Sequence, residues 1–398
     1  MKIHFKNDKV KYGAVRMALR GALLLIFIAL IPACYFLPRL LIRGELADIY
    51  CRNVFPLVSF IPSSLSALFM NSLTEFFVVV GGFALIVLTV AFIVRGFQLL
   101  IRRDIRHFLH YLYVVLRTMA VIGIIAALLF EMMHGINYNR TSIRKSMTLY
   151  GDTRPYQDYA DTLLWAYSGM VEARSELGED YHGVAHMMTS FETSVYDANI
   201  IVSSFSEHYG LGLSQNYIRA KAVWLSHLWS YTNIVGVYDP FLGEVNVNTD
   251  YVDVLHFPVT LCHEITHAKG FASETDANTI AVLSCINSPR ADFRYAGYYY
   301  IFMHLWGTVN EYADHEGETM TDYLSRGDFA PVIRDTRAFN DYWESFDEGP
   351  IADFIARFSE DANNAFLESN GQEGGTETYT VPQNVYVEYY CRYVRADA

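Results

Sequence analysis

Three long apolar runs in the first third of the chain constrain its fold more than any other feature. They cover residues 18–37, 76–94 and 112–130, and the middle run contains no charged side chain. A helix needs about 20 predominantly apolar residues to cross the hydrocarbon of a bilayer, so each run is long enough to span a membrane. The sequence therefore predicts an anchor of three transmembrane helices within residues 1–134, with the lipid bilayer as its partner.

Charge divides the chain at the end of this anchor. Residues 1–134 have a net charge of +8 and residues 135–398 a net charge of −21, which together give the −13 of the whole chain. A basic, apolar front part followed by an acidic part predicts a membrane anchor and then a separate domain at 135–398. Because the second part has no basic stripe, we expect no binding to nucleic acid.

The basic residues also predict an orientation. Lys and Arg gather before the first run and again between the second and third, at Arg95, Arg102, Arg103 and Arg106. The positive-inside rule assigns both places to the cytoplasm. We therefore expect a multi-pass protein of the plasma membrane with a cytoplasmic N-terminus and an extracytoplasmic C-terminal domain.

Two features of the front part have a second interpretation. The leader and first run could form a cleaved signal peptide, although the apolar run continues past Cys34, which favours a retained span. The segment FPLVSFIPSSLSALFM at 55–70 is either an amphipathic helix in the membrane interface or a packed loop.

The strongest chemical motif is His263-Glu264-Ile265-Thr266-His267, an HExxH pattern. Histidines four residues apart lie on the same face of a helix, so both imidazoles can reach one ion. The glutamate between them is suited to act as a general base on a zinc-activated water. The motif predicts a Zn2+ site with His263 and His267 as ligands and Glu264 as the catalytic base.

The residues after the motif predict a helix, a turn and a second helix. The first helix should run from about Val259 to Ala268, and Gly270 should turn the chain. Ser273 is a natural N-cap for the second helix. Glu274 and Asp276 then compete for the third metal position, because they point in nearly opposite directions on a helix.

Glu274 is the favoured third ligand and Asp276 the alternative, with a helix cap as the structural reading of Asp276. Asn278 shares a face with Glu274, so we expect it to hydrogen-bond a ligand and fix the orientation of that ligand.

Other segments complete the predicted domain. Apolar residues at helical spacing predict helices over 156–176 and 195–208, and another over 217–229. Alternation before the motif predicts a strand that forms either a substrate-binding edge or an ordinary hairpin, at Val245, Asn246, Val247 and Asn248. His304, in an aromatic run, is a candidate hydrogen-bond donor to an oxyanion, although packing in the core is the simpler interpretation of that run.

Four passages, in order, carry a resemblance to a known family. They are GINYNR at 135–140, GVYDPFLGEVNVN at 236–248, HEITHAKGFASETDAN at 263–278 and FLESNGQEGGTETY at 366–379. With the three spans they resemble a family of uncharacterised multi-pass bacterial membrane proteins, a domain of unknown function grouped with zincin-type metallopeptidases.

The resemblance implies a ligand set. ETDAN is similar to the ExxxD helix of membrane-associated gluzincin peptidases, in which the glutamate is the third zinc ligand. This implies His263, His267 and Glu274 as ligands and Glu264 as the base. Two departures stand out, since Asn278 replaces the usual aspartate and the spacing to Glu274 is shorter than in most gluzincins. In the metzincin pattern the third histidine would fall at Ser273, which is not a zinc ligand.

Together these features predict a mostly α protein. It would have a three-helix transmembrane anchor and an extracytoplasmic α+β zincin-like domain with a small edge-strand sheet. The expected activity is zinc-dependent hydrolysis of a peptide or protein substrate at the outer membrane face. The alternatives are a non-proteolytic zinc-binding sensor or scaffold, and a membrane structural protein in which HExxH is coincidental.

Overall fold

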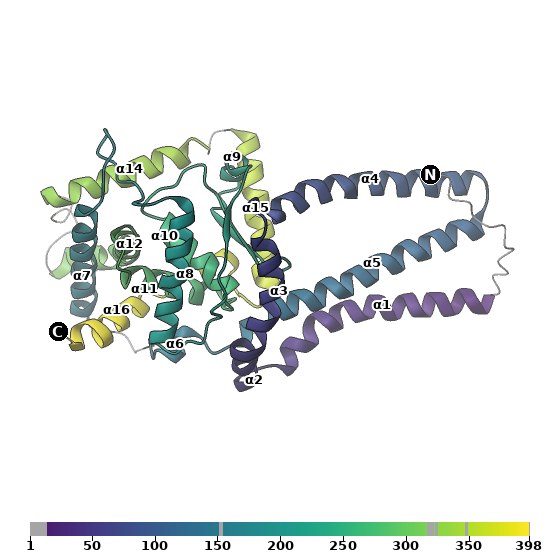
Figure 1. Cartoon of the computed structure of the whole chain (residues 1–398), viewed down its shortest axis with the longest axis horizontal. Helices are drawn as coiled ribbons and strands as arrows, with labels where there is room; N and C mark the ends of the chain where they lie inside the picture. The colour runs from purple at the N-terminus through teal and green to yellow at the C-terminus, as the bar shows by residue number, and fades with distance from the viewer. Residues whose placement is uncertain (1–13, 151–153, 317–321, 323–324, 347–348, 398) are drawn as a thin grey trace. The chain divides into compact units, whose positions relative to one another are not determined.

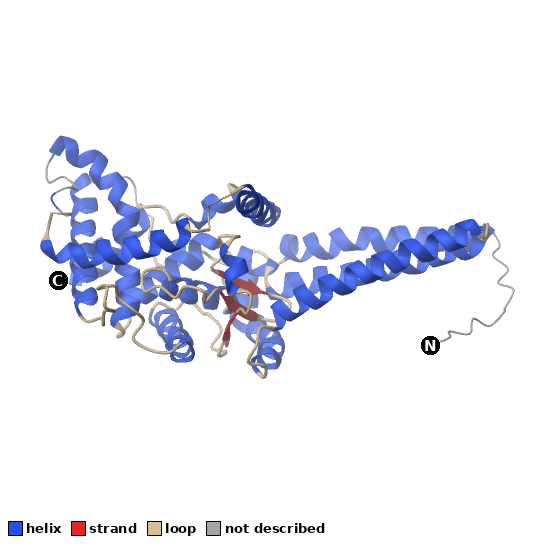
Figure 2. Cartoon of the chain, turned by 90° about the horizontal axis from the view of Figure 1, so that it is seen from above, coloured by secondary structure: helices blue, strands red, loops and turns tan. Residues whose placement is uncertain are grey.

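The structure, a computed structural model, describes residues 14–150, 154–316, 322, 325–346 and 349–397. The chain is mostly helical with one small sheet (Figures 1 and 2). It divides into two compact units. The first comprises the residues up to Leu41 together with Phe76–Glu131, and the second comprises Ile42–Glu75 and Met132–Ala398.

The first unit is built from three long helices, α1 (Ala14–Leu41), α4 (Leu73–Ile101) and α5 (Ile105–Met133). All three are long and apolar enough to cross a membrane, which confirms the predicted runs as candidate spans. Their apolar side chains point outward, which suits a hydrocarbon surrounding and not water. Within this unit Arg39 of α1 pairs with the fully buried carboxylate of Glu131 of α5.

The connection between α1 and α4 belongs to the second unit, and in this the structure differs from the predicted division at residue 134. It forms α2 (Glu45–Ile49), the π-helical turn η1 (Tyr50–Val54) and α3 (Phe55–Ala67). Hydrogen bonds hold this connection to the rest of the second unit. Asp48 accepts them from Thr141, and Glu244 accepts them from Ser66 and Ser72. These contacts join residues far apart in the sequence, so no local pattern indicated them.

The helices of the second unit surround two buried ones, α10 (Phe257–Ala268) and α11 (Glu274–Ile286). Against them pack α8 (Phe191–His208) and α12 (Ala291–Glu316), and α7 (Tyr156–Ser175) packs on α12. This confirms the helices predicted over 156–176 and 195–208. The remaining helical elements are η2 (Gly135–Asn139), α6 (Ile143–Ser146), α9 (Ser226–Ser230), η3 (Gly327–Phe329), α14 (Ala330–Glu344), α15 (Pro350–Ser369), η4 (Gly375–Tyr379), α16 (Asn384–Tyr389), η5 (Tyr390–Val394) and η6 (Arg395–Asp397).

The sheet has three short strands, β1 (Ala220–Ala222), β2 (Gly236–Asp239) and β3 (Glu244–Val247). Their order is β1-β3-β2, with β3 parallel to β1 and antiparallel to β2 (Figure 2). β3 is therefore the central strand. An edge position for Val245, Asn246 and Val247 is therefore wrong, because β3 is paired on both sides, and Asn248 follows the strand. The alternative, an ordinary hairpin, describes the antiparallel pair of β2 and β3.

The helix predicted over 217–229 is also wrong, since this stretch contains β1 and the short α9. The apolar residues at helical spacing suggested a helix, but Ala220–Ala222 pair instead with β3, more than 20 residues later in the sequence. Lys221 of β1 and Glu244 of β3 form a fully buried ion pair, 2.5 Å between Nζ and Oε2.

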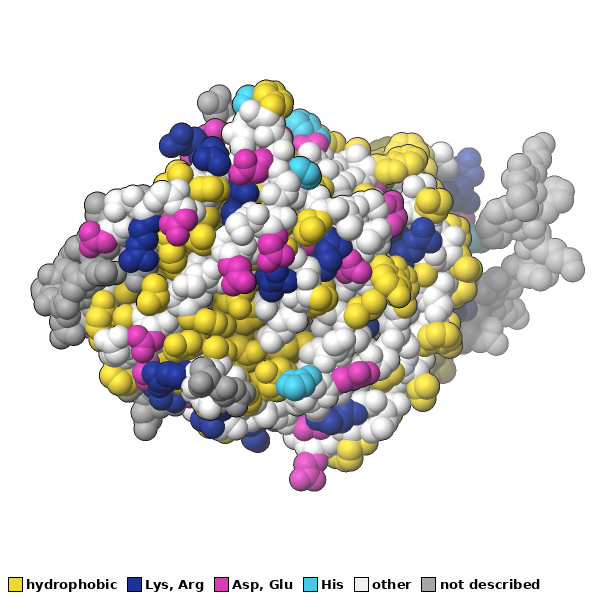
Figure 3. Space-filling model, turned by 60° about the vertical axis from the view of Figure 1, so that its left-hand side comes forward, with side chains coloured by type: hydrophobic (Ala, Val, Ile, Leu, Met, Phe, Trp, Pro, Cys, Tyr) yellow, Lys and Arg dark blue, Asp and Glu magenta, His cyan; other side chains and the backbone are white. Residues whose placement is uncertain are grey.

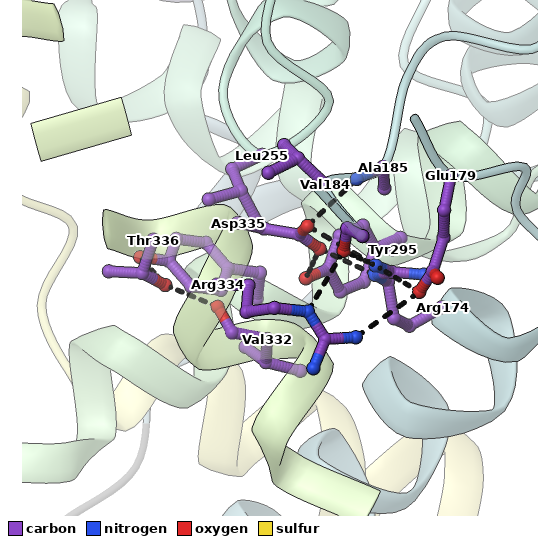
Figure 4. Close-up of polar contacts among 12 residues, drawn as sticks. Arg174, Glu179, Val184, Ala185, Leu255, Tyr295, Val332, Arg334, Asp335 and Thr336 are labelled. Atoms are coloured by element: carbon purple, nitrogen blue, oxygen red, sulfur yellow. Dashed lines mark hydrogen bonds and ion pairs between the residues drawn. The ribbon is translucent and has the colours of Figure 1, made fainter. Parts of the chain in front are cut away.

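A second buried ion pair holds the outer helices of this unit together (Figure 4). Arg174 of α7 donates to Asp335 of α14, 2.5 Å between Nε and Oδ2, and Tyr295 of α12 donates to the same oxygen at 2.8 Å. Outside such contacts, basic and acidic side chains are interspersed on the face drawn in Figure 3.

Candidate metal centre

The HExxH helix and its successor have the ends that the sequence predicts. Pro258 stands in the first turn of α10, where a missing N–H costs no hydrogen bond. Gly270 follows α10 with a φ of 107°, a conformation that side chains with a Cβ rarely adopt. Ser273 caps α11 by accepting a hydrogen bond from the N–H of Asp276. This tight turn folds the first residue of α11, Glu274, back against α10.

The turn brings His263, His267 and Glu274 together in the interior. The two Nε2 atoms lie 2.9 Å apart, and each lies 3.2 Å from Oε2 of Glu274. All three side chains are buried, with at most 8% of any side chain exposed. The ring of His267 is oriented by a 2.7 Å hydrogen bond between its Nδ1 and the carbonyl of Phe271. Nδ1 of His263 is buried and has no partner among the described residues.

This donor set fits a zinc ion. Tetrahedral zinc with bonds of about 2.0–2.1 Å keeps its nitrogen and oxygen donors about 3.3 Å apart. The observed separations of 2.9 and 3.2 Å are within a few tenths of an ångström of that spacing. Two neutral imidazoles and a carboxylate are ligands that zinc accepts in catalytic sites, with a fourth position left open.

The electrostatics of the cluster favour a cation. Burial opposes ionisation of Glu274, but His267 and His263 hold the pKa of Glu274 well below its usual range. Despite burial, the charges of Glu274 and then Glu264 raise the pKa of His267 to about 9. Without an ion the cluster thus retains a proton at neutral pH, and a metal ion would replace that proton.

Glu264 lies between the cluster and the edge strand β2. Its side chain is so close to Gly236 that a Cβ at that position would be 2.8 Å from Oε1 of Glu264. The N–H of Tyr238, also in β2, hydrogen-bonds the carboxylate. Burial raises the pKa of Glu264, which makes this carboxylate a stronger base than an exposed one.

The structure distinguishes the two competing carboxylates. Asp276 points away from the histidines and accepts a hydrogen bond from the N–H of Ile143, at 3.3 Å. Burial raises the pKa of Asp276 to about 6. Among the described residues Glu274, and not Asp276, thus joins the histidines, and Asp276 takes part in the cap of α11 through its backbone N–H, which donates to Ser273.

Asn278 has a different contact from the one predicted. Its side-chain amide donates to the backbone carbonyl of Tyr379 at 2.7 Å, and no hydrogen bond to a histidine or to Glu274 joins it among the described residues. Thr275 donates in the same way to the carbonyl of Thr378. These two bonds hold the segment η4 against α11, so Asn278 positions the C-terminal segment instead of a ligand.

Sequence reasoning missed Tyr379, which this segment places over the cluster. Its ring lies 6.1 Å from that of His263, and Asn363 hydrogen-bonds its side chain. Burial and the nearby charge of Glu274 raise the pKa of Tyr379, so the phenol keeps its proton at neutral pH.

His134 is a second residue near the cluster that the sequence did not indicate. Its ring lies 6.0 Å from that of His267. The only sequence signal for either residue was its place in or next to a passage of the family resemblance.

His304 does not reach the cluster. Its ring packs between those of Tyr300 and Tyr386, and burial lowers its pKa. The simpler interpretation, an aromatic core, describes it correctly, and its role as an oxyanion donor is not supported by its position.

A cavity of about 780 Å³ opens onto His263 and Glu264. The segment that leads into β2 forms one wall, at 232–237, and residues of α15 form the opposite wall, at 355–363. Tyr300, Asn278 and Tyr379 complete the lining. The cavity thus borders both the base and β2, the outer strand of the sheet.

Comparison with known proteins identifies the family. The family described as "Protein of unknown function (DUF3810)" matches residues 50–382, which is most of the chain. The chain belongs to this family. The match covers the connection between α1 and α4 from Tyr50 onward, the candidate spans α4 and α5, and the three candidate metal ligands of this DUF3810 chain. Neither a curated protein nor a solved structure matches it.

Proposed function

We propose that this DUF3810 chain is a membrane-anchored zinc metallopeptidase whose second unit is a zincin-like domain. The observation that supports it best is the convergence of His263, His267 and Glu274, with Glu264 beside them at the end of a cavity. A coincidental HExxH has no reason to bring a third ligand to both histidines, or to leave the adjacent glutamate buried at a cavity wall.

The residues of the chain divide the chemistry among them. A zinc ion bound by the three ligands supplies an activated water and a Lewis acid for the scissile carbonyl. Glu264 takes the proton of the attacking water on its carboxylate and delivers it to the leaving amine. The phenol of Tyr379 remains protonated and lines the same cavity, so it is suited to donate a hydrogen bond to the developing oxyanion.

The edge strand supports a peptide as the substrate. Among the residues that the structure describes, β2 pairs on one side only, with β3, and its residues Gly236 and Val237 line the cavity. An extended peptide that pairs with such an edge gains backbone hydrogen bonds along its length. We propose β2, and not β3, as the strand along which the substrate lies, on the extracytoplasmic side of a bacterial plasma membrane.

The Glu264→Gln variant tests the proposal. The full-length chain in detergent should contain one zinc ion per molecule and cleave peptides of a random library. Glu264→Gln should retain the zinc and lose the cleavage, because the amide cannot accept a proton. Glu172→Gln, an exposed position on α7, is the matched control and should cleave normally.

Two results would contradict the peptidase. Absence of stoichiometric zinc would remove the metal centre altogether. Zinc binding with no cleavage by the wild-type chain would favour the alternative, a non-proteolytic zinc-binding sensor or scaffold.

A further inference from the structure

Helix α3 has its polar and apolar faces reversed for a helix on a protein in water. The residues that it buries are mainly serines, with Ser59 only 2% exposed and Ser63 and Ser66 similarly covered. The residues that it exposes are large and apolar: Leu57 is 73%, Ile61 63% and Leu65 58% exposed. A helix on a water-soluble surface has the opposite arrangement, with its apolar stripe toward the core.

The buried serines are hydrogen-bonded, and the partner of Ser66 fixes the orientation of the helix because it lies outside α3. Ser66 donates to the buried carboxylate of Glu244 at 2.5 Å, and Ser63 donates to the carbonyl of Ser59, one turn earlier, at 2.7 Å. Gly243 lies so close that a Cβ there would be 3.1 Å from the backbone nitrogen of Ser63. Rotating α3 to hide its apolar stripe would break the bond to Glu244, so the outward stripe is built into the fold.

The apolar surface continues beyond α3. Leu68 and Met70 follow the helix and are 76% and 77% exposed, and no charged residue occurs between Arg52 and Glu75. Trp224, 78% exposed, is tethered beside the start of α4, because its backbone N–H donates to Glu75 at 2.9 Å. Exposed tryptophan next to the end of a span is typical of the boundary between hydrocarbon and headgroups.

The connection that contains α3 joins two helices that can each cross a membrane, α1 and α4. A chain that crosses the bilayer in both must hold this connection at one membrane face. We infer that the outward face of α3, with Leu68, Met70 and Trp224, is a membrane-inserted surface of the second unit, and that lipid acyl chains cover it.

This surface bears on the proposed function. Glu244 ties α3 to the central strand β3, and β3 pairs with β2, the strand beside the cavity. A bilayer that holds α3 therefore also holds this sheet close to the membrane. If the proposed peptidase is correct, its substrates are polypeptide segments next to a membrane surface and not freely diffusing peptides.

Photolabelling from within the bilayer tests the inference. The full-length chain would be reconstituted in phosphatidylcholine vesicles containing a lipid with a diazirine at the end of its acyl chain. Labelled residues would be located by mass spectrometry of peptides. Leu57, Ile61 and Leu65 should be labelled several-fold more than Tyr181, which is 92% exposed elsewhere on the second unit, and comparably to Leu85 of α4.

Matched variants sharpen the test. Ile61→Asp should abolish the labelling of α3, whereas Ile200→Asp, an exposed apolar position on α8, should leave it unchanged. The Glu264→Gln chain should be labelled like the wild type, which separates this inference from the proposed hydrolysis. Labelling of α3 no stronger than that of Tyr181 in the wild-type chain overturns the inference. Labelling of α3 that stays at the Tyr181 level in densely loaded vesicles but rises when the chain is diluted in lipid would assign the surface to a second copy and overturn it equally.

Discussion

At the scale of single residues, Glu274 and Asp276 are chemically similar and two positions apart, yet only Glu274 faces the histidines. Loss of a residue that only hydrogen-bonds a metal ligand typically weakens metal binding about 10–100-fold. Glu274→Gln removes a ligand itself, so it should weaken zinc binding at least as much. Asp276→Asn is the matched control and should bind zinc like the wild type. Competition with a fluorescent chelator measures both affinities. Equal losses in the two variants would contradict the assignment.

Tyr379 offers a second test at this scale. Tyr379→Phe removes only the hydroxyl, so kcat should fall by about 100-fold, the usual effect of losing one oxyanion donor, with KM and zinc content unchanged. Tyr300→Phe provides the comparison, since Tyr300 lines the same cavity from α12. Steady-state kinetics with one cleaved peptide from the library would measure kcat and KM for both variants. A Tyr379→Phe chain with normal kcat would leave the phenol without a catalytic role.

At the scale of elements, the approach of β2 to α10 depends on Gly236. Gly236→Ala places a methyl group 2.8 Å from the carboxylate of Glu264, so either the strand or the base must move. We expect turnover to fall while the zinc content remains stoichiometric. Gly307→Ala in α12, where nothing lies within 4 Å, should keep full activity. Normal turnover in Gly236→Ala would mean that β2 can shift away from the site at no cost.

The buried pair of Lys221 and Glu244 holds the sheet to α3 and gives a stability prediction. Lys221→Met leaves Glu244 buried without its counter-charge, which should cost about 3–5 kcal/mol in the free energy of unfolding. The double variant Lys221→Met with Glu244→Gln removes both charges and should recover part of that loss. Thermal unfolding in detergent compares them. Similar melting temperatures for the single variant and the wild type would contradict the importance of the pair.

The same elements explain what the sequence could and could not predict. The segment from Pro258 to Glu274 was predicted correctly. Its helix start, its turn at Gly270 and the cap of the next helix are each determined by residues adjacent in the sequence. The edge strand was misplaced because alternation marks a strand without saying which neighbours pair with it. Tyr379 was missed because it reaches the cluster through hydrogen bonds from Thr275 and Asn278, about a hundred positions earlier in the chain.

At the scale of the whole molecule, the described residues contain three helices that can span a membrane, an odd number. If all three cross, the two ends of the chain lie on opposite sides. The turn between α4 and α5 is short and contains Arg102 and Arg103, and Arg106 follows in the first turn of α5. The positive-inside rule predicts the cytoplasmic side for these three residues. We therefore expect the second unit, with its candidate metal centre, outside the cytoplasm.

A C-terminal fusion to the full chain tests this orientation. Alkaline phosphatase, which is active only outside the cytoplasm, should be active on the wild-type chain, and a green fluorescent protein in the same place should stay dark. Replacing Arg102, Arg103 and Arg106 by Gln removes three of the basic residues that predict this orientation and should raise the inverted fraction. The same three changes at Arg334, Arg337 and Arg357, about 200 residues after the last candidate span in the sequence, should have no effect. A bright fluorescent fusion on the wild-type chain would place the cavity in the cytoplasm and redirect the search for its substrate there.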